Sequence, residues 1–251
     1  MPKSNKRKFI RYFLLLFWIS VFGWQFYQMN ASGFDESVVF ASDEEVKFTE
    51  SEDYLSFHSI KCLSKTSILF FPGALVQPEA YAPLARKLAK QGYEVYIQKI
   101  PFRIAITDNM EQEALKIAAL KIKSTRGAKW IVSGHSRGGR MAANYSVQYP
   151  ETISGMILLG TSHPKEKNLT GLKFPVLKVS ASEDGLASPS EIKQFASNLP
   201  SSTKFVMIEG GNHSQFGYYG FQFGSGSATI TRKEQQQITE TEILDYLNSL
   251  N

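Results

Sequence analysis

The sequence predicts an α/β protein with a mostly parallel central sheet and helices on both of its faces. Apolar segments of strand length alternate with amphipathic segments of helix length from residue 66 onward, and this alternation is typical of parallel β-α-β units. The chain has 251 residues, 43% of them hydrophobic and 20% charged, which is enough for one substantial core. We expect three regions: a membrane-like segment at 1–33, an acidic spacer with leading edge strands at 34–65, and the α/β domain at 66–251.

The first region has the composition of a membrane anchor. Five basic residues stand before an uncharged run from Tyr12 to Trp24. With its flanks, from Phe9 to Met29, the run has 21 residues, about the length that crosses a ~30 Å hydrocarbon core. Because positive flanks stay in the cytoplasm, the rest of the chain would lie on the extracytoplasmic side.

Two other interpretations of this region remain open. The small residues at 31–33 would suit a signal-peptidase site, in which case the domain is secreted after cleavage. The third option is a buried helix of the domain, although five cations beside an apolar run are costly in a core.

The net charge of +5 belongs to this N-terminal region. Five of the 28 basic residues lie in residues 1–33, which hold none of the 23 acidic residues. The remaining chain is neutral overall, so the basic balance gives no reason to expect a nucleic-acid partner. The single cysteine, Cys62, excludes an internal disulfide and paired-cysteine zinc or redox motifs.

The pattern of apolar residues predicts the elements in order. In the acidic spacer, short apolar pieces at 38–40 and 46–48 predict one or two edge strands. The later strands are predicted at 67–71, 94–100, 129–133, 153–159, 176–180 and 204–208. Helices are predicted at 78–91, 110–124, 137–149, 191–199 and 231–250. Thr231 and Glu234 form a capping-box pattern at the start of the last helix.

A Gly-x-Ser-x-Gly motif lies between a predicted strand and a predicted helix. It comprises Gly134, Ser136 and Gly138. In this context the motif is typical of a nucleophile elbow, a sharp turn that exposes a serine hydroxyl. Side chains at the two glycines would collide with the neighbouring strand or helix, and the helix N-terminus favours developing negative charge. We therefore expect Ser136 to be a nucleophile.

Two candidate partners for the serine follow the next predicted strands. Asp184 comes after the strand at 176–180, and His213 comes after the strand at 204–208. A serine nucleophile needs a base, and the order serine, acid, histidine suits this turn. We expect His213 to act as general base and then general acid, with Asp184 as the orienting carboxylate. Glu183 is the alternative acid, and Asp184 with Gly185 is also a common turn pair.

The oxyanion of such a reaction needs backbone N–H donors. We expect one from Arg137, directly after the nucleophile, and one from Ala74, in the turn after the strand at 67–71. The Arg137 side chain would either favour anionic substrates or lie on the surface of the first helical turn.

Residues 66–251 resemble the α/β-hydrolase fold, and within it the small, lid-poor bacterial members near dienelactone hydrolases and carboxylesterases. The resemblance is carried by Phe71-Pro72-Gly73, Tyr81-Ala82-Pro83-Leu84, Pro101-Phe102, Gly134 to Gly139, Asp184, and Gly211 to Gly217. Dienelactone hydrolases proper have a cysteine at the elbow, where this chain has Ser136, so that lactone chemistry is not expected. The segment at 160–174 is too short for a helical cap, which implies an open site. The aromatic loop at 217–224 would either line an acyl pocket or pack onto the sheet.

These patterns together predict a membrane-anchored serine hydrolase of carboxylic esters. Its substrate would be a small-molecule or lipid-like ester. No metal or organic cofactor is expected, because the sequence has no ligand cluster. The alternatives are an acyltransferase that uses the same residues and a non-catalytic, hydrolase-like binding module.

Overall fold

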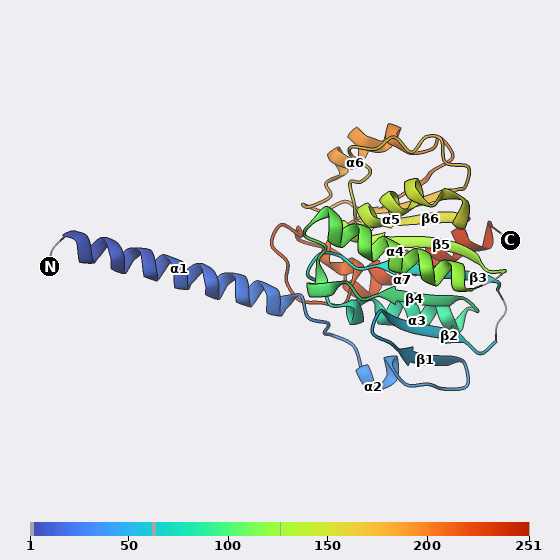
Figure 1. Cartoon of the computed structure of the whole chain (residues 1–251), viewed down its shortest axis with the longest axis horizontal. Coiled ribbons are helices and arrows are strands. Elements are labelled where there is room, and N and C mark those ends of the chain that lie inside the picture. The colour runs from blue at the N-terminus through green and yellow to red at the C-terminus, as the bar shows by residue number, and fades with distance from the viewer. Residues whose placement is uncertain (1–2, 62–63, 126, 251) are drawn as a thin grey trace.

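The computed structural model of the chain describes residues 3–61, 64–125 and 127–250, so Cys62 lies outside the described residues. Eight strands form one sheet in the order β1-β2-β4-β3-β5-β6-β7-β8. The β1–β2 and β2–β4 pairs are antiparallel, and the other five pairs are parallel. The predicted α/β fold with a mostly parallel sheet is confirmed (Figure 1).

The strands and helices have the following bounds. The strands are β1 Val46–Glu50, β2 Tyr54–Ser59, β3 Thr66–Phe71, β4 Glu94–Gln98, β5 Lys129–His135, β6 Gly155–Leu159, β7 Val176–Ala181 and β8 Lys204–Ile208. The helices are α1 Lys3–Gln28, α2 Glu36–Val39, α3 Ala82–Lys90, α4 Asp108–Ser124, α5 Arg137–Gln148, α6 Pro189–Phe195 and α7 Arg232–Asn248. The capping box predicted from Thr231 and Glu234 is present at the start of α7.

The structure corrects the predicted elements in several places, and the strand β2, Tyr54–Ser59, was not predicted at all. The apolar piece at 38–40 is not a strand, because Asp35 accepts a hydrogen bond from the Ser37 amide and begins the short helix α2. The predicted helix at 78–91 is a 3-10 turn, Pro78–Tyr81, followed by α3. The predicted helix at 191–199 starts earlier, at Pro189, and gives way to the 3-10 turn Ala196–Asn198.

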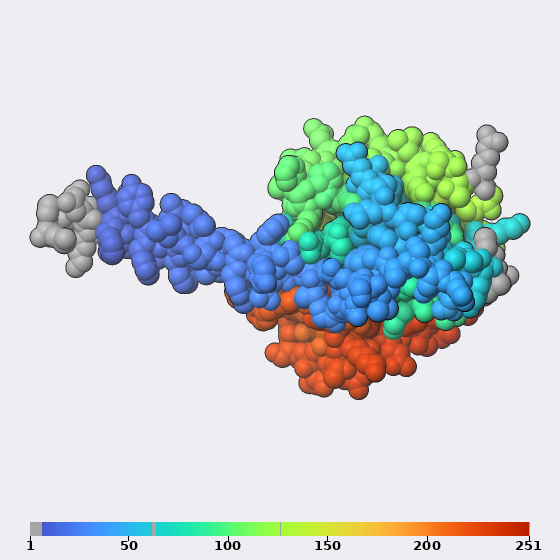
Figure 2. All heavy atoms as spheres, turned by 90° about the horizontal axis from the view of Figure 1, so that it is seen from below, coloured from blue at the N-terminus to red at the C-terminus, as the bar shows by residue number. Residues whose placement is uncertain are grey.

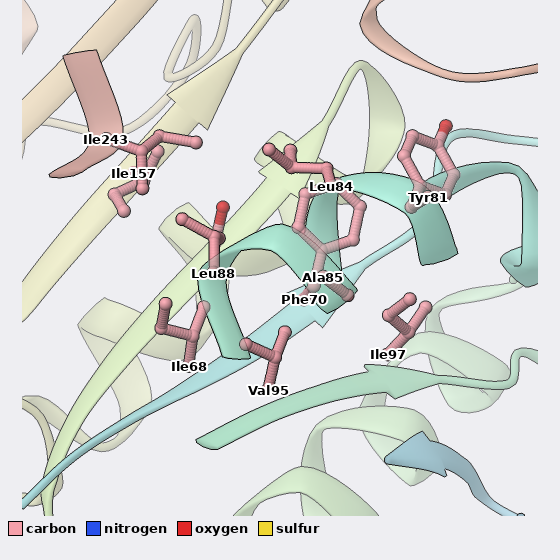
Figure 3. A pocket seen from close by; sticks show the side chains of 11 residues that line it. Ile68, Phe70, Tyr81, Leu84, Ala85, Leu88, Val95, Ile97, Ile157 and Ile243 are labelled. Carbon is pink, nitrogen blue, oxygen red and sulfur yellow. The ribbon is translucent and has the colours of Figure 1, made fainter. Parts of the chain in front are cut away.

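Helices cover both faces of the sheet and divide the core in two. Successive residues of β3 point to opposite faces, so Ile68 packs with α3 and α7 while Leu69 packs with α4 and α5. Figure 3 shows the packing between α3, α7 and the sheet, where Leu84, Leu88 and Ile243 surround a small apolar gap. This gap lies on the face of the sheet and forms part of the hydrophobic core.

The helix α1 projects away from the domain (Figures 1 and 2). It is the one helix among the described residues that is long and apolar enough to cross a membrane, from Arg7 to Gln28. None of its most apolar 18-residue window is buried against the rest of the chain. It is therefore not a core helix of the domain, whereas an anchor and a signal sequence both have these properties.

A lysine lies in the interior of the sheet. Lys178, on β7, is only 2% exposed, and its ammonium donates to the His163 carbonyl oxygen at 2.6 Å. Burial penalises the charged form and lowers the pKa of Lys178 to about 7. In the unfolded chain a lysine has a pKa near 10.4. Between about pH 7 and about pH 10 the side chain is therefore protonated in the unfolded chain and neutral in the folded one.

We expect Lys178→Met to remove the loss of stability that the buried lysine causes at low pH. The free energy of unfolding of the natural chain should rise with pH between about 7 and about 10, because the buried amine is neutral there. Lys178→Met should therefore be the more stable chain near pH 6, and its advantage should shrink as the pH rises. Urea unfolding in detergent across this range measures the difference. Lys116→Met, at an exposed position on α4, is the control, and an advantage that does not change with pH would contradict the assignment.

Candidate active site

The proposed nucleophile lies at a strained turn between β5 and α5. Ser136 has φ 54° and ψ −119°, a backbone conformation that residues other than glycine rarely adopt. Its amide donates to the Leu159 carbonyl oxygen on the neighbouring strand at 3.0 Å. The turn is therefore held by the neighbouring strand β6, as expected where strain of about 1–3 kcal/mol is retained.

The positions of the motif require glycine for steric reasons. A side chain at Gly134 would overlap the backbone carbonyl of Gly138, and one at Gly138 would overlap the Phe71 carbonyl at the end of β3. A side chain at Gly139 would lie 2.6 Å from the Thr161 methyl carbon. The first turn of α5 therefore packs directly on the two strand ends, as the motif predicts.

The predicted acid and histidine form a buried pair. His213 Nδ1 and Asp184 Oδ2 are 2.8 Å apart, and both side chains are buried. The other carboxylate oxygen of Asp184 accepts hydrogen bonds from the amides of Leu186 and Ala187, at 2.8 and 2.7 Å. These contacts fix the carboxylate, which in turn favours a proton on Nδ1 and leaves Nε2 as an acceptor. Glu183 is exposed and its carboxylate accepts from the Ser182 hydroxyl instead.

Ser136 and His213 line the same polar pocket at the edge of the sheet. Nε2 of His213 is buried and has no hydrogen-bond partner among the described residues. In that part of the chain no hydrogen bond joins the ring to the Ser136 hydroxyl. The pocket thus brings the two groups together without a direct bond, and such bonds often tighten only when a substrate is bound.

A buried tyrosine links the turn after β3 to the end of β5, and the sequence analysis assigned it no role in the site. The Tyr81 hydroxyl accepts from the Gly73 amide at 3.0 Å and lies 2.8 Å from Nδ1 of His135. Burial, and then the charge of His213, lower the pKa of His135 well below its usual value. The Tyr81 hydroxyl can therefore donate a hydrogen bond to Nδ1 of a neutral His135. The sequence places Tyr81 in a helical apolar pattern, which only predicts a core position.

The two amides expected to form an oxyanion hole lie at this edge. Phe71 pairs with Gly134 across β3 and β5, so Ala74 follows one strand end and Arg137 follows the other. No hydrogen bond among the described residues uses either amide N–H group. Leu75, the next residue, has φ 65° and donates to the Arg103 carbonyl oxygen at 2.7 Å, which holds the turn around Ala74.

Cationic side chains line the pocket but are partly balanced by acids. The guanidinium of Arg137 donates to the Ala105 carbonyl oxygen at 2.5 Å and lies 3.9 Å from the buried carboxylate of Glu111. Arg140 also lies 3.9 Å from Glu111. Arg137 is therefore half-buried and tied to a neighbouring loop.

A second histidine, His163, also lines the pocket. Burial, and then the positive charge of Arg140, lower its pKa to about 4, so it is neutral near pH 7. His58 is elsewhere: it lies within β2 and pairs with Glu94. Among the residues that the structure describes, no group of three His, Cys, Asp or Glu side chains is placed to hold a metal ion.

Comparison with known families places the fold. Residues 67–237 match a family described as the alpha/beta hydrolase family. Comparison with curated proteins finds no match.

Several solved structures are similar to this chain. A predicted CIB-like hydrolase from Thermoplasma acidophilum has a TM-score of 0.59 at 19% identity, over 79% of this chain and 97% of that chain. A soluble variant of monoglyceride lipase from Saccharomyces cerevisiae has a TM-score of 0.63 at 12% identity, over 85% and 97%. A hormone-sensitive lipase from a metagenome library has a TM-score of 0.61 at 15% identity, over 86% and 88%. At these identities the likeness is one of fold.

We expect Gly138→Ala to destabilise the chain strongly, because its methyl group would overlap the Phe71 carbonyl. Overpacking of this kind costs about 1–3 kcal/mol or more. Thermal unfolding of the full chain in detergent measures the loss. Gly171→Ala is the matched control, because nothing lies within 4 Å of the added carbon there. Equal unfolding temperatures for the two variants would contradict the packing described at the elbow.

Proposed function

Because this chain belongs to the alpha/beta hydrolase family, over residues 67–237, we propose that it hydrolyses carboxylic esters through an acyl-enzyme on Ser136. His213 is the general base and general acid, and Asp184 orients it. The observation that carries the proposal is the buried Asp184–His213 pair beside the pocket that Ser136 lines.

The first half of the reaction acylates the serine. Ser136 Oγ attacks the ester carbonyl carbon while Nε2 of His213 takes the hydroxyl proton. The backbone N–H groups of Arg137 and Ala74 donate to the oxyanion that forms. When the tetrahedral intermediate collapses, its C–O bond to the alcohol breaks. The alcohol leaves with the proton from His213, and the acyl group stays on Ser136.

The second half releases the acid. Water gives a proton to Nε2 of His213 and attacks the acyl carbonyl carbon. Collapse of the second intermediate breaks the bond to Ser136 Oγ, which takes the proton back, and frees the carboxylic acid. Every group in this scheme comes from the chain, the substrate or water, so the proposal includes no metal or organic cofactor.

Two features of the described residues support these roles. A buried nitrogen without a partner costs about 1–3 kcal/mol, and Nε2 of His213 is such an atom. Its position on the pocket that Ser136 lines gives it a use: it can accept the serine proton. The carboxylate of Asp184 then stabilises the imidazolium that forms.

Two observations support the substrate class: the segment beside the pocket, and the similar solved structures. The segment between β6 and β7 contains no helix, so no helical cap is inserted at this point. Two of the similar structures are described as lipases, which favours a lipid-like ester. We further propose that α1 anchors the chain in a membrane with the domain outside the cytoplasm, the alternative being secretion after cleavage.

We expect Ser136→Ala and His213→Ala each to lower kcat/KM by at least about 10³-fold, because each removes a group that the reaction needs. Asp184→Asn should cost roughly 10²-fold or more, through the wrong tautomer of His213. The measurement is hydrolysis of a p-nitrophenyl ester panel by the full chain in detergent. His58→Ala is the control, since His58 pairs with Glu94 in the sheet.

A fluorophosphonate probe and product analysis separate the alternatives. The probe should label the natural chain and not Ser136→Ala. Transfer of the acyl group to an added alcohol in place of water would identify an acyltransferase. A folded natural chain that neither hydrolyses esters nor reacts with the probe would be a binding module, and the proposed hydrolysis would be wrong.

A further inference from the structure

The C-terminal end of α1 is attached to the edge of the sheet that carries the proposed active site. Gln77, Arg103 and the loop at 217–224 all contact this end, and they follow β3, β4 and β8. Ser136 and His213 follow β5 and β8. In a parallel sheet these strand ends lie at one edge. Figure 1 shows α1 leaving the domain from that side.

The attachment is made by backbone and side-chain hydrogen bonds. The side-chain amide of Gln25 donates to the Phe221 carbonyl oxygen at 3.0 Å and accepts from the Phe223 amide at 3.1 Å. Gln28 accepts from the amides of Gly220 and Phe221, at 2.7 and 3.0 Å. The loop beside His213 is therefore bonded directly to the last turn of the helix.

No flexible linker separates the helix from the domain. Met29 is buried in the core, and its carbonyl oxygen accepts from the Gln77 amide at 3.0 Å. The Ala31 amide donates to the Gln77 side chain at 2.7 Å, and the Ser32 amide donates to the Tyr218 carbonyl oxygen at 2.9 Å. The direction of α1 relative to the sheet is thus fixed.

The length of α1 determines how deep in the membrane its contacts with the domain lie. Arg7 to Gln28 is 22 residues, which at about 1.5 Å per residue spans about 33 Å, against a ~30 Å hydrocarbon core. Its last turn then lies at the membrane–water boundary. Trp24, just before that turn, packs on the rings of Phe221 and Phe223, with centroids 5.8 and 5.9 Å apart. These two rings therefore lie at the same boundary.

Exposed apolar side chains flank the pocket on both sides. Phe221 and Phe223 are each 53% exposed. Leu186, which lines the pocket, lies against Gly224 and so connects the aromatic loop to the site. On the other side Phe102 is 82% and Ile106 69% exposed. Ala105 lies between these two residues, and its carbonyl oxygen accepts from Arg137, which also lines the pocket.

We propose that this edge of the domain contacts the outer leaflet of the membrane that α1 spans, and that the site takes ester-bearing amphiphiles directly from that leaflet. The proposal rests on the proposed hydrolysis for its substrate, and on the geometry of α1 for its direction. Burial of exposed phenylalanine rings at a lipid surface is favourable. It also gives these side chains a partner that water does not provide.

The depth of the surface is tested with spin labels on the full chain in phosphatidylcholine vesicles. In a Cys62→Ser background, a label at Phe102→Cys should be accessible to oxygen and shielded from a water-soluble nickel complex. A label at Ile60→Cys should show the opposite pattern. Ile60 follows β2, which is antiparallel to β4, and so lies at the opposite edge. Equal exposure of the two labels to the nickel complex would overturn the proposal.

The source of the substrate is tested by a ratio of two rates. In the same vesicles, the chain is given either a water-soluble short-chain p-nitrophenyl ester or a long-chain fluorogenic ester held in the bilayer, and the rate of hydrolysis of each is measured. Phe102→Asn with Ile106→Ser should lower the ratio of bilayer rate to soluble rate by about tenfold. Ile60→Ser, the control, should leave the ratio unchanged.

The outcomes separate the two proposals. If the natural chain fails on both esters, the proposed hydrolysis is wrong, while the spin-label pattern still decides the orientation. If the soluble ester is hydrolysed and the ratio is the same in every variant, the membrane-facing site is wrong. A mature chain that lacks residues 1–33, detected by its mass, would also overturn it.

Discussion

The close approach of α5 to the end of β3 is the constraint on which the site depends. The backbone of Gly138 lies against the Phe71 carbonyl with no room for a methyl group. This contact places the first turn of α5, Ser136 and the turn that holds Ala74 at one corner of the sheet. The unusual φ of Ser136 persists because its amide is bonded to Leu159 on the neighbouring strand. A looser packing would release both the strain and the alignment.

His135 lies against His213, and its neutral form allows the site to hold a positive charge on His213. The rings of His135 and His213 have centroids 4.6 Å apart, so two charged imidazoles would repel each other. Burial keeps His135 neutral, and its contact with the Tyr81 hydroxyl suits the neutral form. In the proposed reaction, the imidazolium of His213 would therefore face the carboxylate of Asp184 without a second charged imidazole beside it.

The sequence predicts the parts of the site that depend on local pattern. Ser136 lies in a motif with fixed spacing, and Asp184 and His213 each follow a strand, so strand order alone brings them to one edge. Tyr81 and the α1 contacts could not be predicted in this way. Tyr81 reaches His135 across 54 positions and Gln25 reaches Phe221 across 196, and no spacing rule connects such distant residues. The helix at 36–39 was missed because one side-chain cap outweighed an apolar run.

The two glutamines near the end of α1 bear on whether this helix is retained. Composition alone places Gln25 and Gln28 at a membrane boundary as polar residues that water would solvate. In the structure their side chains bond to the backbone of the loop beside His213. In water such exposed hydrogen bonds contribute little, but they strengthen where the surrounding dielectric constant is low. These contacts support the proposed retention of α1 over its cleavage as a leader. Cleavage at 31–33 would remove both glutamines together with the buried Met29, and would leave the aromatic loop without these contacts.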